Sequence, residues 1–485
     1  MMPNDAVPAL RVRRRSFQPM LRPLALASLL ASGATGALAQ ADPNGILRSG
    51  PMLADVTHRG ATVWVQTQAS DATGASRVVE VTAASGESVA ARGRAETAWD
   101  GTASVALFGL EPGERYTYTV TVDGAQVETA YPLEIETQPL WQWRTDPPEF
   151  TLAVGSCYYD NDTAYDRPDE WYADTLAFTS PYGGSTEVFH AIREAEPDAM
   201  LWLGDNVYLR EVDWWSPKGI AYRYARSREA PDLQPLLASA AHYATWDDHD
   251  YGPNDSDRSY VHKDAALETF QRFWPNPTHG MPGVPGVFTQ FEWGDAEVFL
   301  LDNRYHRAPN ATPGGGHDYF GEEQMRWLLD ALTASRATFK IIANGGQILN
   351  PVEVFENMAN VAPVERTLFL NEVRQRQIDG LVFLAGDRHH TELVRVDRVG
   401  TYPLYGFTSS PLTAGASTYA LREDSPEFEN PARVPGTLVA GEQSFGTLAF
   451  SGPREDRVLT MRAHSASGDV LWERTVRAAE LRTPR

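Results

Sequence analysis

Six short apolar runs, each followed by a residue able to bind a metal or a phosphate, constrain the fold of this chain more than any other feature. Runs of this length and composition predict buried β-strands. In open α/β sheets, ligands bind beyond the carboxyl ends of the strands. We therefore predict that oxygen, imidazole and one thiolate ligand meet in one crevice. The runs lead to Cys157, Asp205, Asp247, Asp302, Asn344 and Asp387.

Length, charge and cysteine content limit the classes of protein to which this chain can belong. A chain of 485 residues is too long for one typical core, so we expect two or more domains. The formal net charge of −22 argues against a broad basic face that binds nucleic acid. Cys157 is the only cysteine, which excludes an intramolecular disulfide. A single cysteine is more often a buried small hydrophobe than a ligand, but its place beyond a predicted strand favours a ligand.

The amino terminus has the layout of an export signal. Arginines precede an apolar stretch at residues 24–30, and Ala-Leu-Ala at residues 37–39 forms a cleavage site, which predicts a signal peptide over residues 1–39. Arg14-Arg15-Ser16-Phe17 is similar to the twin-arginine signal; an ordinary basic region is the alternative. We expect the twin-arginine translocase as a partner during export, a periplasmic or secreted protein, and no membrane span in the mature chain, because the apolar stretch is short.

Residues 46–138 predict an all-β module. Its apolar segments alternate or carry β-branched and aromatic residues, and Gly, Pro and Asp turns separate them. The segment LEPGERYTY at residues 110–118 resembles the tyrosine-containing corner of fibronectin type III domains, which implies a β-sandwich. The module contains no catalytic cluster, so we expect it to act as a spacer, a lid or a binding surface.

The remainder of the chain predicts a layered α/β domain. Predicted strands alternate with helical periods, as in residues 186–195 and 322–335, where Met325, Leu328, Leu329 and Leu332 recur at helical spacing. Strand, polar loop, helix and strand in this order are typical of α/β architecture. We predict a catalytic domain at residues 149–452, and further strands at residues 453–485 that complete it at a sheet edge.

Two motifs concentrate carboxylates beyond predicted strands. GDNVY at residues 204–208 places Asp205 three residues before Tyr208; a plain turn is the alternative. WDDHDYGPND at residues 246–255 holds four aspartates, a histidine and an asparagine. Burying these carboxylates together is costly without counter-charge, so bound cations explain the motif better than a solvated acidic loop does.

Two further motifs add histidine and arginine. In an extended loop alternate residues point the same way, so in GDRHHTE we expect Asp387 and His389 to face one metal while Arg388 and His390 turn elsewhere. LDNRYHR at residues 301–307 adds positive charge to an acidic pocket. A planar guanidinium suits bidentate phosphate binding. We therefore expect the substrate phosphate to be bound by Arg304, Arg307 and Arg388.

The motifs GSC, GDNVY, WDDHDYGPND, LDNRYHR and GDRHHTE, behind a fibronectin-like module and an export signal, together resemble the PhoD-like alkaline phosphatase family of the calcineurin-like metallophosphoesterase superfamily. The resemblance covers the chain from about Gly50 to the final strands. It implies an α/β fold with a four-layered α/β/β/α metallophosphoesterase domain preceded by the all-β fibronectin III-like sandwich. It further implies a phosphoric ester hydrolase acting on a small phosphate ester.

The resemblance also implies a metal site that contains iron (Fe³⁺) and calcium. A second set of metal ligands is expected in WDDHDYGPND, where either Asp248 or Asn254 supplies the oxygen, with Asn254 favoured. Asn344 stands where the superfamily has a histidine, which favours an oxygen-rich second site and so calcium, although another divalent metal remains an alternative. Carried over residue by residue, the other implied metal ligands are Cys157, Asp205, Tyr208, Asp387 and His389.

The expected reaction is hydrolysis of phosphate esters by in-line attack of a metal-bound hydroxide. We expect Asp205 to bridge two cations, Arg304 to steady the phosphoryl oxygens and His249 to assist the departing alkoxide. A phosphodiesterase or phospholipase D-like activity in the same site is the main alternative. From another class, the alternative is a cell-surface binding protein with a vestigial site.

Overall fold

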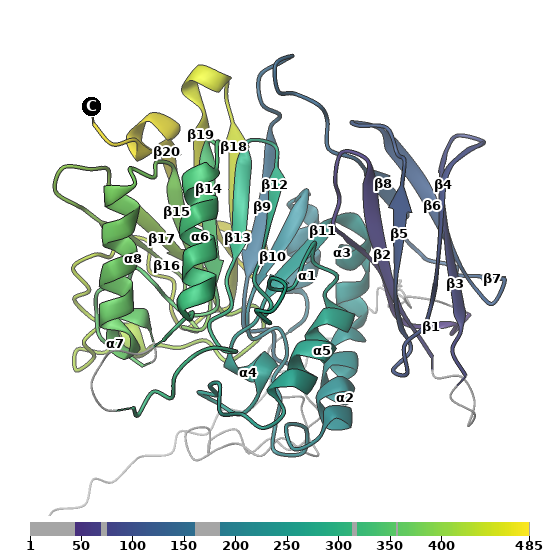
Figure 1. The fold of residues 1–485 in the computed structure, drawn as a ribbon, viewed down its shortest axis with the longest axis horizontal. Helices are drawn as coiled ribbons and strands as arrows, with labels where there is room; N and C mark the ends of the chain where they lie inside the picture. Colours follow the sequence, from purple (N-terminus) through teal and green to yellow (C-terminus); the bar gives the residue numbers. More distant parts are fainter. Residues whose placement is uncertain (1–43, 69–74, 161–184, 313–317, 356, 485) are drawn as a thin grey trace, which may run out of the picture. The chain divides into compact units, whose positions relative to one another are not determined.

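The computed structural model describes residues 44–68, 75–160, 185–312, 318–355 and 357–484 (Figure 1). The predicted signal peptide at residues 1–39 lies outside these ranges. Among the described residues, no helix combines the length and the apolar composition that crossing a bilayer requires. The described chain forms three β-sheets with helices packed against two of them.

The largest sheet has nine strands in the order β20-β19-β18-β9-β10-β11-β1-β2-β5. Its centre is parallel, because β10 pairs in parallel with both β9 and β11. The strands β18, β19 and β20 are antiparallel neighbours that extend it to one edge. Its bounds are β1 (Leu47–Ala54), β2 (Gly60–Thr67), β5 (Thr102–Phe108), β9 (Phe150–Gly155), β10 (Ala199–Leu203), β11 (Ala241–Thr245), β18 (Ser444–Ser451), β19 (Val458–Ser465) and β20 (Val470–Arg477).

A second sheet has six strands in the order β12-β13-β14-β15-β17-β16. The four central strands are parallel, and the two edge strands are antiparallel. All six predicted apolar runs are strands, three in each of these two sheets, which confirms that part of the prediction. The bounds are β12 (Thr289–Trp293), β13 (Ala296–Leu300), β14 (Phe339–Asn344), β15 (Leu381–Ala385), β16 (Glu392–Val396) and β17 (Leu404–Thr408).

The two sheets stack face to face. Ring centroids of Phe339 in β14 and Phe450 in β18 are 5.3 Å apart, and those of Phe407 in β17 and Trp472 in β20 are 5.0 Å apart. Side chains on alternate positions of β10 point to opposite sides: Leu201 joins the core between the sheets, and Trp202 joins a core under the helices. Strands buried on both faces explain why the runs are uniformly apolar.

Helices cover the outer faces of both sheets, which confirms the four-layered α/β/β/α fold (Figure 1). Phe369 of α8 contacts Phe383 of β15 at 6.2 Å between centroids. On the other sheet, Phe189 of α1 lies 6.1 Å from Trp202 of β10. The bounds are α1 (Val188–Glu194), α2 (Pro217–Arg228), α3 (Gln234–Ser239), α4 (Asp248–Tyr251), α5 (Lys263–Phe273), α6 (Glu322–Ala334), α7 (Met358–Val361) and α8 (Pro363–Gln375).

The predicted sandwich is present at the amino-terminal end of the described chain. A five-stranded sheet containing β3 (Val78–Ser85), β4 (Ser88–Glu96), β6 (Arg115–Val122), β7 (Ala125–Gln126) and β8 (Glu134–Glu136) packs against β1, β2 and β5. In the predicted corner, the backbone N–H of Glu111 donates to the hydroxyl of Tyr116 at 2.9 Å. Tyr116 therefore fixes the turn that precedes its own strand.

The sandwich shares a sheet with the catalytic part of the chain. Strand β1 pairs in parallel with β11, with Leu53 opposite Ala241. The backbone N–H of Val56 also donates to the hydroxyl of Tyr243 at 3.2 Å. The domain bounds of 46–138, 149–452 and 453–485 stay predictions, and the sheet itself runs across two of those boundaries.

Candidate metal centre

Loops from both stacked sheets meet at the carboxyl ends of their strands. Two glycines allow the contact: a Cβ on Gly345 would lie 2.6 Å from Cγ of Asp247, and one on Gly386 would lie 2.5 Å from Cβ of Ser156. The Gly386 N–H also donates to the carbonyl of Gly345 at 2.7 Å. The strand ends of β9, β11, β14 and β15 are therefore in direct contact.

Two groups of donor atoms lie in this region. In the first donor group (Cys157, Asp205, His389) and in the second (Asp205, Asp248, His249), the ligating atoms lie within 4.8 Å of one another. Cys157 Sγ is 3.7 Å from Asp205 Oδ2. Asp205 belongs to both groups, so its carboxylate is placed where a ligand can bridge two cations.

Tyr208 lies beside the first donor group, and Asp248 rather than Asn254 lies in the second. The Tyr208 hydroxyl is 3.0 Å from Nε2 of His389. Asp248 is buried at the start of α4, where the following backbone N–H, of His249, points at Asp205 Oδ1 at 3.3 Å. Asn254 is exposed in the turn after α4, so the structure brings Asp248 into the cluster, and a ligand role for Asn254 stays a prediction.

Four of the predicted metal ligands have left-handed backbone conformations. The φ angles are 60° at Cys157, 51° at Asp205, 64° at Asp387 and 52° at His389. The extended loop predicted for GDRHHTE is therefore wrong, and alternation along a strand is not what directs Asp387 and His389. A left-handed residue other than glycine costs about 1–2 kcal/mol, and such strain gathers at functional sites.

Burial disfavours the charged forms of the clustered groups. It raises the pKa of Asp205 well above its usual value, and the negative charges of the Asp248 carboxylate and the Cys157 thiolate raise it further. Burial likewise raises the pKa of Cys157 to about 12 and lowers the pKa of His249 to about 4. A bound multivalent cation reverses these preferences by supplying counter-charge.

The donor chemistry around the cluster fits cations. The side-chain oxygens of Asn303 and Asn344 are buried and have no hydrogen-bond partner among the described residues, and the same holds for Nδ1 of His249. Buried polar atoms are normally paired. Unpaired oxygens near crowded carboxylates are donors that could bind a cation.

The three arginines predicted to bind substrate are buried and engaged by the protein. Arg304 forms an ion pair with Asp247, and Nη2 of Arg388 lies 2.7 Å from Oε2 of Glu427. Arg307 is 1% exposed. Arg304 and Arg388 supply counter-charge to buried carboxylates, whereas Arg307 donates to the side-chain oxygen of Asn310 at 2.8 Å. Direct contact of any of the three with substrate stays a prediction.

Arg210 is a more accessible cation that was not among the residues predicted from the sequence. Its guanidinium lies 5.4 Å from the centre of the Tyr208 ring, and its Nε donates to the hydroxyl of Tyr159 at 2.7 Å. Arg210 follows Tyr208 by two residues and is half-buried. Its position in the extended motif GDNVYLR was the available signal.

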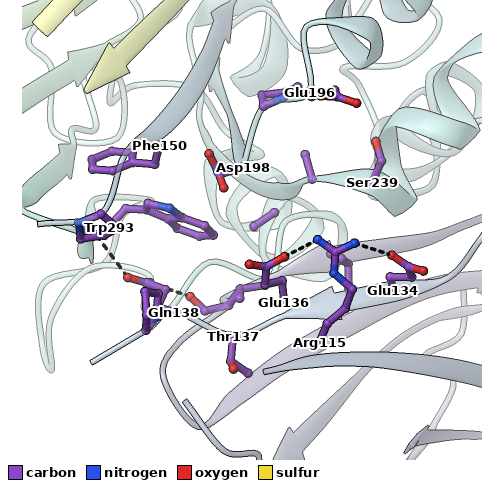
Figure 2. A pocket seen from close by; sticks show the side chains of 18 of the residues that line it. Arg115, Glu134, Glu136, Thr137, Gln138, Phe150, Glu196, Asp198, Ser239 and Trp293 are labelled. Atoms are coloured by element: carbon purple, nitrogen blue, oxygen red, sulfur yellow. Dashed lines mark hydrogen bonds and ion pairs between the residues drawn. The ribbon is translucent and has the colours of Figure 1, made fainter. Parts of the chain in front are cut away.

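A cavity of 740 Å³ lies at the opposite ends of the parallel strands (Figure 2). Its lining includes Phe150 at the start of β9 and Asp198 just before β10. Figure 2 shows Arg115 held between Glu134 and Glu136, with nearest N···O distances of 3.5 and 2.7 Å. None of the candidate ligands lines this cavity, so its size does not mark the metal centre.

Comparison with known proteins identifies relatives of both parts of the chain. The family model described as "PhoD-like phosphatase" matches residues 171–456, and a domain of unknown function, DUF7800, matches residues 44–140. No match is found among curated proteins.

Two solved structures share the fold. The structure described as PhoD has a TM-score of 0.71 and 16% identity, covering 89% of this chain and 92% of that chain. A purple acid phosphatase, PPD1 from yellow lupin (Lupinus luteus) seeds, has a TM-score of 0.59 and 12% identity, covering 88% and 74% respectively. At these identities the likeness shows the fold.

Proposed function

The chain belongs to the PhoD-like phosphatase family of metal-dependent phosphoric ester hydrolases, and from that premise we propose that it is an exported phosphatase with an iron and calcium centre. The observation that carries the proposal is the position of Asp205 in both donor groups. A carboxylate shared between two sets of ligands is what a two-cation phosphatase requires.

The two donor groups differ in chemistry. Cys157 and Tyr208 supply sulfur and phenolic oxygen, which suit iron, and Asp387 and His389 complete that set. Asp248 supplies carboxylate oxygen, with Asn254 as the alternative, and oxygen donors suit calcium. Cations held by these residues would supply the positive charge that lowers the pKa of a bound water and offsets negative charge developing on the phosphoryl oxygens.

The surrounding side chains would orient the phosphate ester. Burial lowers the pKa of His249 to about 4, which favours the neutral imidazole, and in that form it would assist a departing alkoxide by donating a hydrogen bond. Arg210, half-buried beside Tyr208, is placed to attract the phosphoryl group. Arg304 contributes by holding Asp247 in place.

Metal analysis and a paired assay test this function. We expect purified protein to contain stoichiometric iron, to show a visible charge-transfer band and to hydrolyse p-nitrophenyl phosphate faster than its bis ester. Chelation is expected to abolish hydrolysis, and iron with calcium to restore it, because the buried acidic groups require counter-charge.

Each alternative has its own outcome in the same assay. Full activity in an iron-free protein would refute the iron assignment. Faster hydrolysis of the bis ester would favour a phosphodiesterase or phospholipase D-like enzyme. Absence of hydrolysis with both metals supplied would favour a cell-surface binding protein.

Export is the second part of the proposal and rests on the sequence of residues 1–39. The twin-arginine route carries folded proteins, which would allow the thiolate of Cys157 to bind metal before the protein leaves a reducing compartment. A fusion of residues 1–45 to a folded reporter is expected to be exported, and changing both Arg14 and Arg15 to Lys is expected to stop it. Unchanged export of the double variant would contradict the twin-arginine assignment.

A further inference from the structure

Ser410 contacts two of the candidate ligands at once. It follows β17 by two residues, and its Oγ lies 3.2 Å from Cys157 Sγ. The same oxygen accepts a hydrogen bond from the backbone N–H of His389 at 2.9 Å. Ser410 and Cys157 are both fully buried, so no solvent competes for these contacts.

Ser410 is a hydrogen-bond donor to the sulfur. Its hydroxyl has one proton to donate, and its Oγ has donor geometry toward Cys157 Sγ while accepting from His389. Ser156 Oγ also lies within hydrogen-bond distance of this sulfur, at 3.4 Å, and of the carbonyl of Ser409, at 3.0 Å. Ser410 differs from Ser156 in that it also contacts His389.

The segment that follows Ser410 also holds the backbone of the cysteine. The N–H groups of Thr413 and Ala414 donate to the Cys157 carbonyl at 3.2 and 3.1 Å, and the N–H of Leu412 donates to Ser156 at 2.8 Å. Cys157 and His389 both have left-handed backbones. Such conformations persist only where neighbours over-determine them, and Ser410 spans both.

We propose that Ser410 is a positioning residue that fixes the Cys157 sulfur against His389 and tunes how strongly the sulfur donates electrons to a bound metal. This inference rests on the proposed function, in which Cys157 is a metal ligand. A hydrogen bond to a thiolate withdraws charge from sulfur, and partners of this kind orient metal ligands and set their basicity. Losing the bond therefore changes the electronic state of the centre as well as its geometry.

The test compares Ser410→Ala with Ser409→Ala. Ser409 is an equally buried neighbour whose hydroxyl donates to the carbonyl of Val154 at 2.9 Å, so it serves as a matched control. We expect Ser410→Ala to shift the sulfur-to-iron charge-transfer band to lower energy and to weaken iron binding about 10- to 100-fold. Ser409→Ala is expected to leave both measurements unchanged.

Two further variants keep the test decisive if Ser410→Ala fails to fold. Ser410→Thr retains the hydroxyl and is expected to keep the wild-type band, whereas Ser410→Val, which has nearly the same shape as Thr but no hydroxyl, is expected to show the shift. A wild-type band and iron affinity in Ser410→Ala, or a wild-type band in Ser410→Val, would overturn the inference alone. A wild-type protein without iron or the band would overturn the proposed ligand set together with it.

Discussion

Replacing Asp205 by Asn is expected to reduce phosphate-ester hydrolysis at least about a thousandfold, equivalent to about 4 kcal/mol of transition-state stabilisation. Within the described residues, Asp205 is the member common to the first and second donor groups. The amide preserves the shape of the side chain but removes the negative charge that both cations would share. Steady-state kcat/KM with p-nitrophenyl phosphate and the metal content of the variant provide the measurement.

The same substitution is expected to stabilise the protein once metals are stripped. Burial, then the charge of Asp248, raises the pKa of Asp205 in the folded state, above an unfolded value of about 4. The stability contributed by the protonated carboxyl is therefore full below about pH 4 and is lost as pH rises through the folded pKa. Asp205→Asn does not titrate, so its thermal midpoint in chelator should exceed that of the wild type at pH 8.

The exposed carboxylate of Asp330 provides a matched control. Asp330 lies on α6 and pairs at the surface with Arg376, so Asp330→Asn makes the same chemical change far from buried charge. It is expected to alter neither hydrolysis nor the pH dependence of stability. Wild-type activity in Asp205→Asn would show that no essential cation depends on this carboxylate.

Replacing Arg304 by Met is expected to lower the free energy of unfolding by about 3–5 kcal/mol, because it leaves Asp247 buried without its ion-pair partner. Both side chains are at most 1% exposed. Asn303 also donates to the same Asp247 oxygen at 2.8 Å, but an amide does not replace the lost positive charge. Urea unfolding of the metal-stripped protein measures the loss.

A second substitution separates ion-pair loss from packing loss. In the double variant Asp247→Asn with Arg304→Met the buried ion pair is removed as a unit, so a large part of the lost stability should return; Asp248, 3.8 Å from Arg304 in the wild type, keeps its charge. An undiminished loss in the double variant would show that the effect does not come from leaving Asp247 unpaired. If Arg304 instead binds substrate directly, as the sequence indicated, Arg304→Met would raise KM while leaving the free energy of unfolding near its wild-type value.

The strands were predictable because their signal is local. Each of the six runs is short, apolar and ends at a polar residue, and each forms a strand buried on both faces. The location of Asp205 and Tyr208 just beyond a strand was predictable for the same reason, since the motif follows its strand directly. The left-handed backbones of Asp387 and His389 were not, because contacts from elsewhere in the chain select them.

The ion-pair partners of the charged residues could not be predicted, because they lie far from those residues along the chain. The sequence shows guanidinium groups near the motifs, but Arg388 is engaged by Glu427, which belongs to a different segment. Ser410 has no motif of its own and reaches Cys157 only through the fold. Sequence patterns therefore indicated which polar groups lie together beyond the strand ends, whereas the residues that contact those groups required the structure.

The sandwich contains one feature that was predictable from the sequence and one that was not. Its tyrosine corner has a sequence signature, and the hydrogen bond from Glu111 to Tyr116 is present. The pairing of Leu53 with Ala241 has no signature, because one parallel contact between distant strands leaves no periodic pattern. A module that the sequence presents as separate is therefore joined to the sheet that carries the candidate ligands.

The order of strands in the nine-stranded sheet also determines when the protein can be completed during its synthesis. Strand β9, which leads to Cys157, pairs on one side with β10 and on the other with β18, where Leu152 lies opposite Leu448. Until the ribosome has made β18, the backbone N–H and C=O groups on one edge of β9 have no partner strand and can pair incorrectly. Contacts this distant along the chain form slowly, so the sulfur ligand reaches its final surroundings only after nearly the whole polypeptide has been translated.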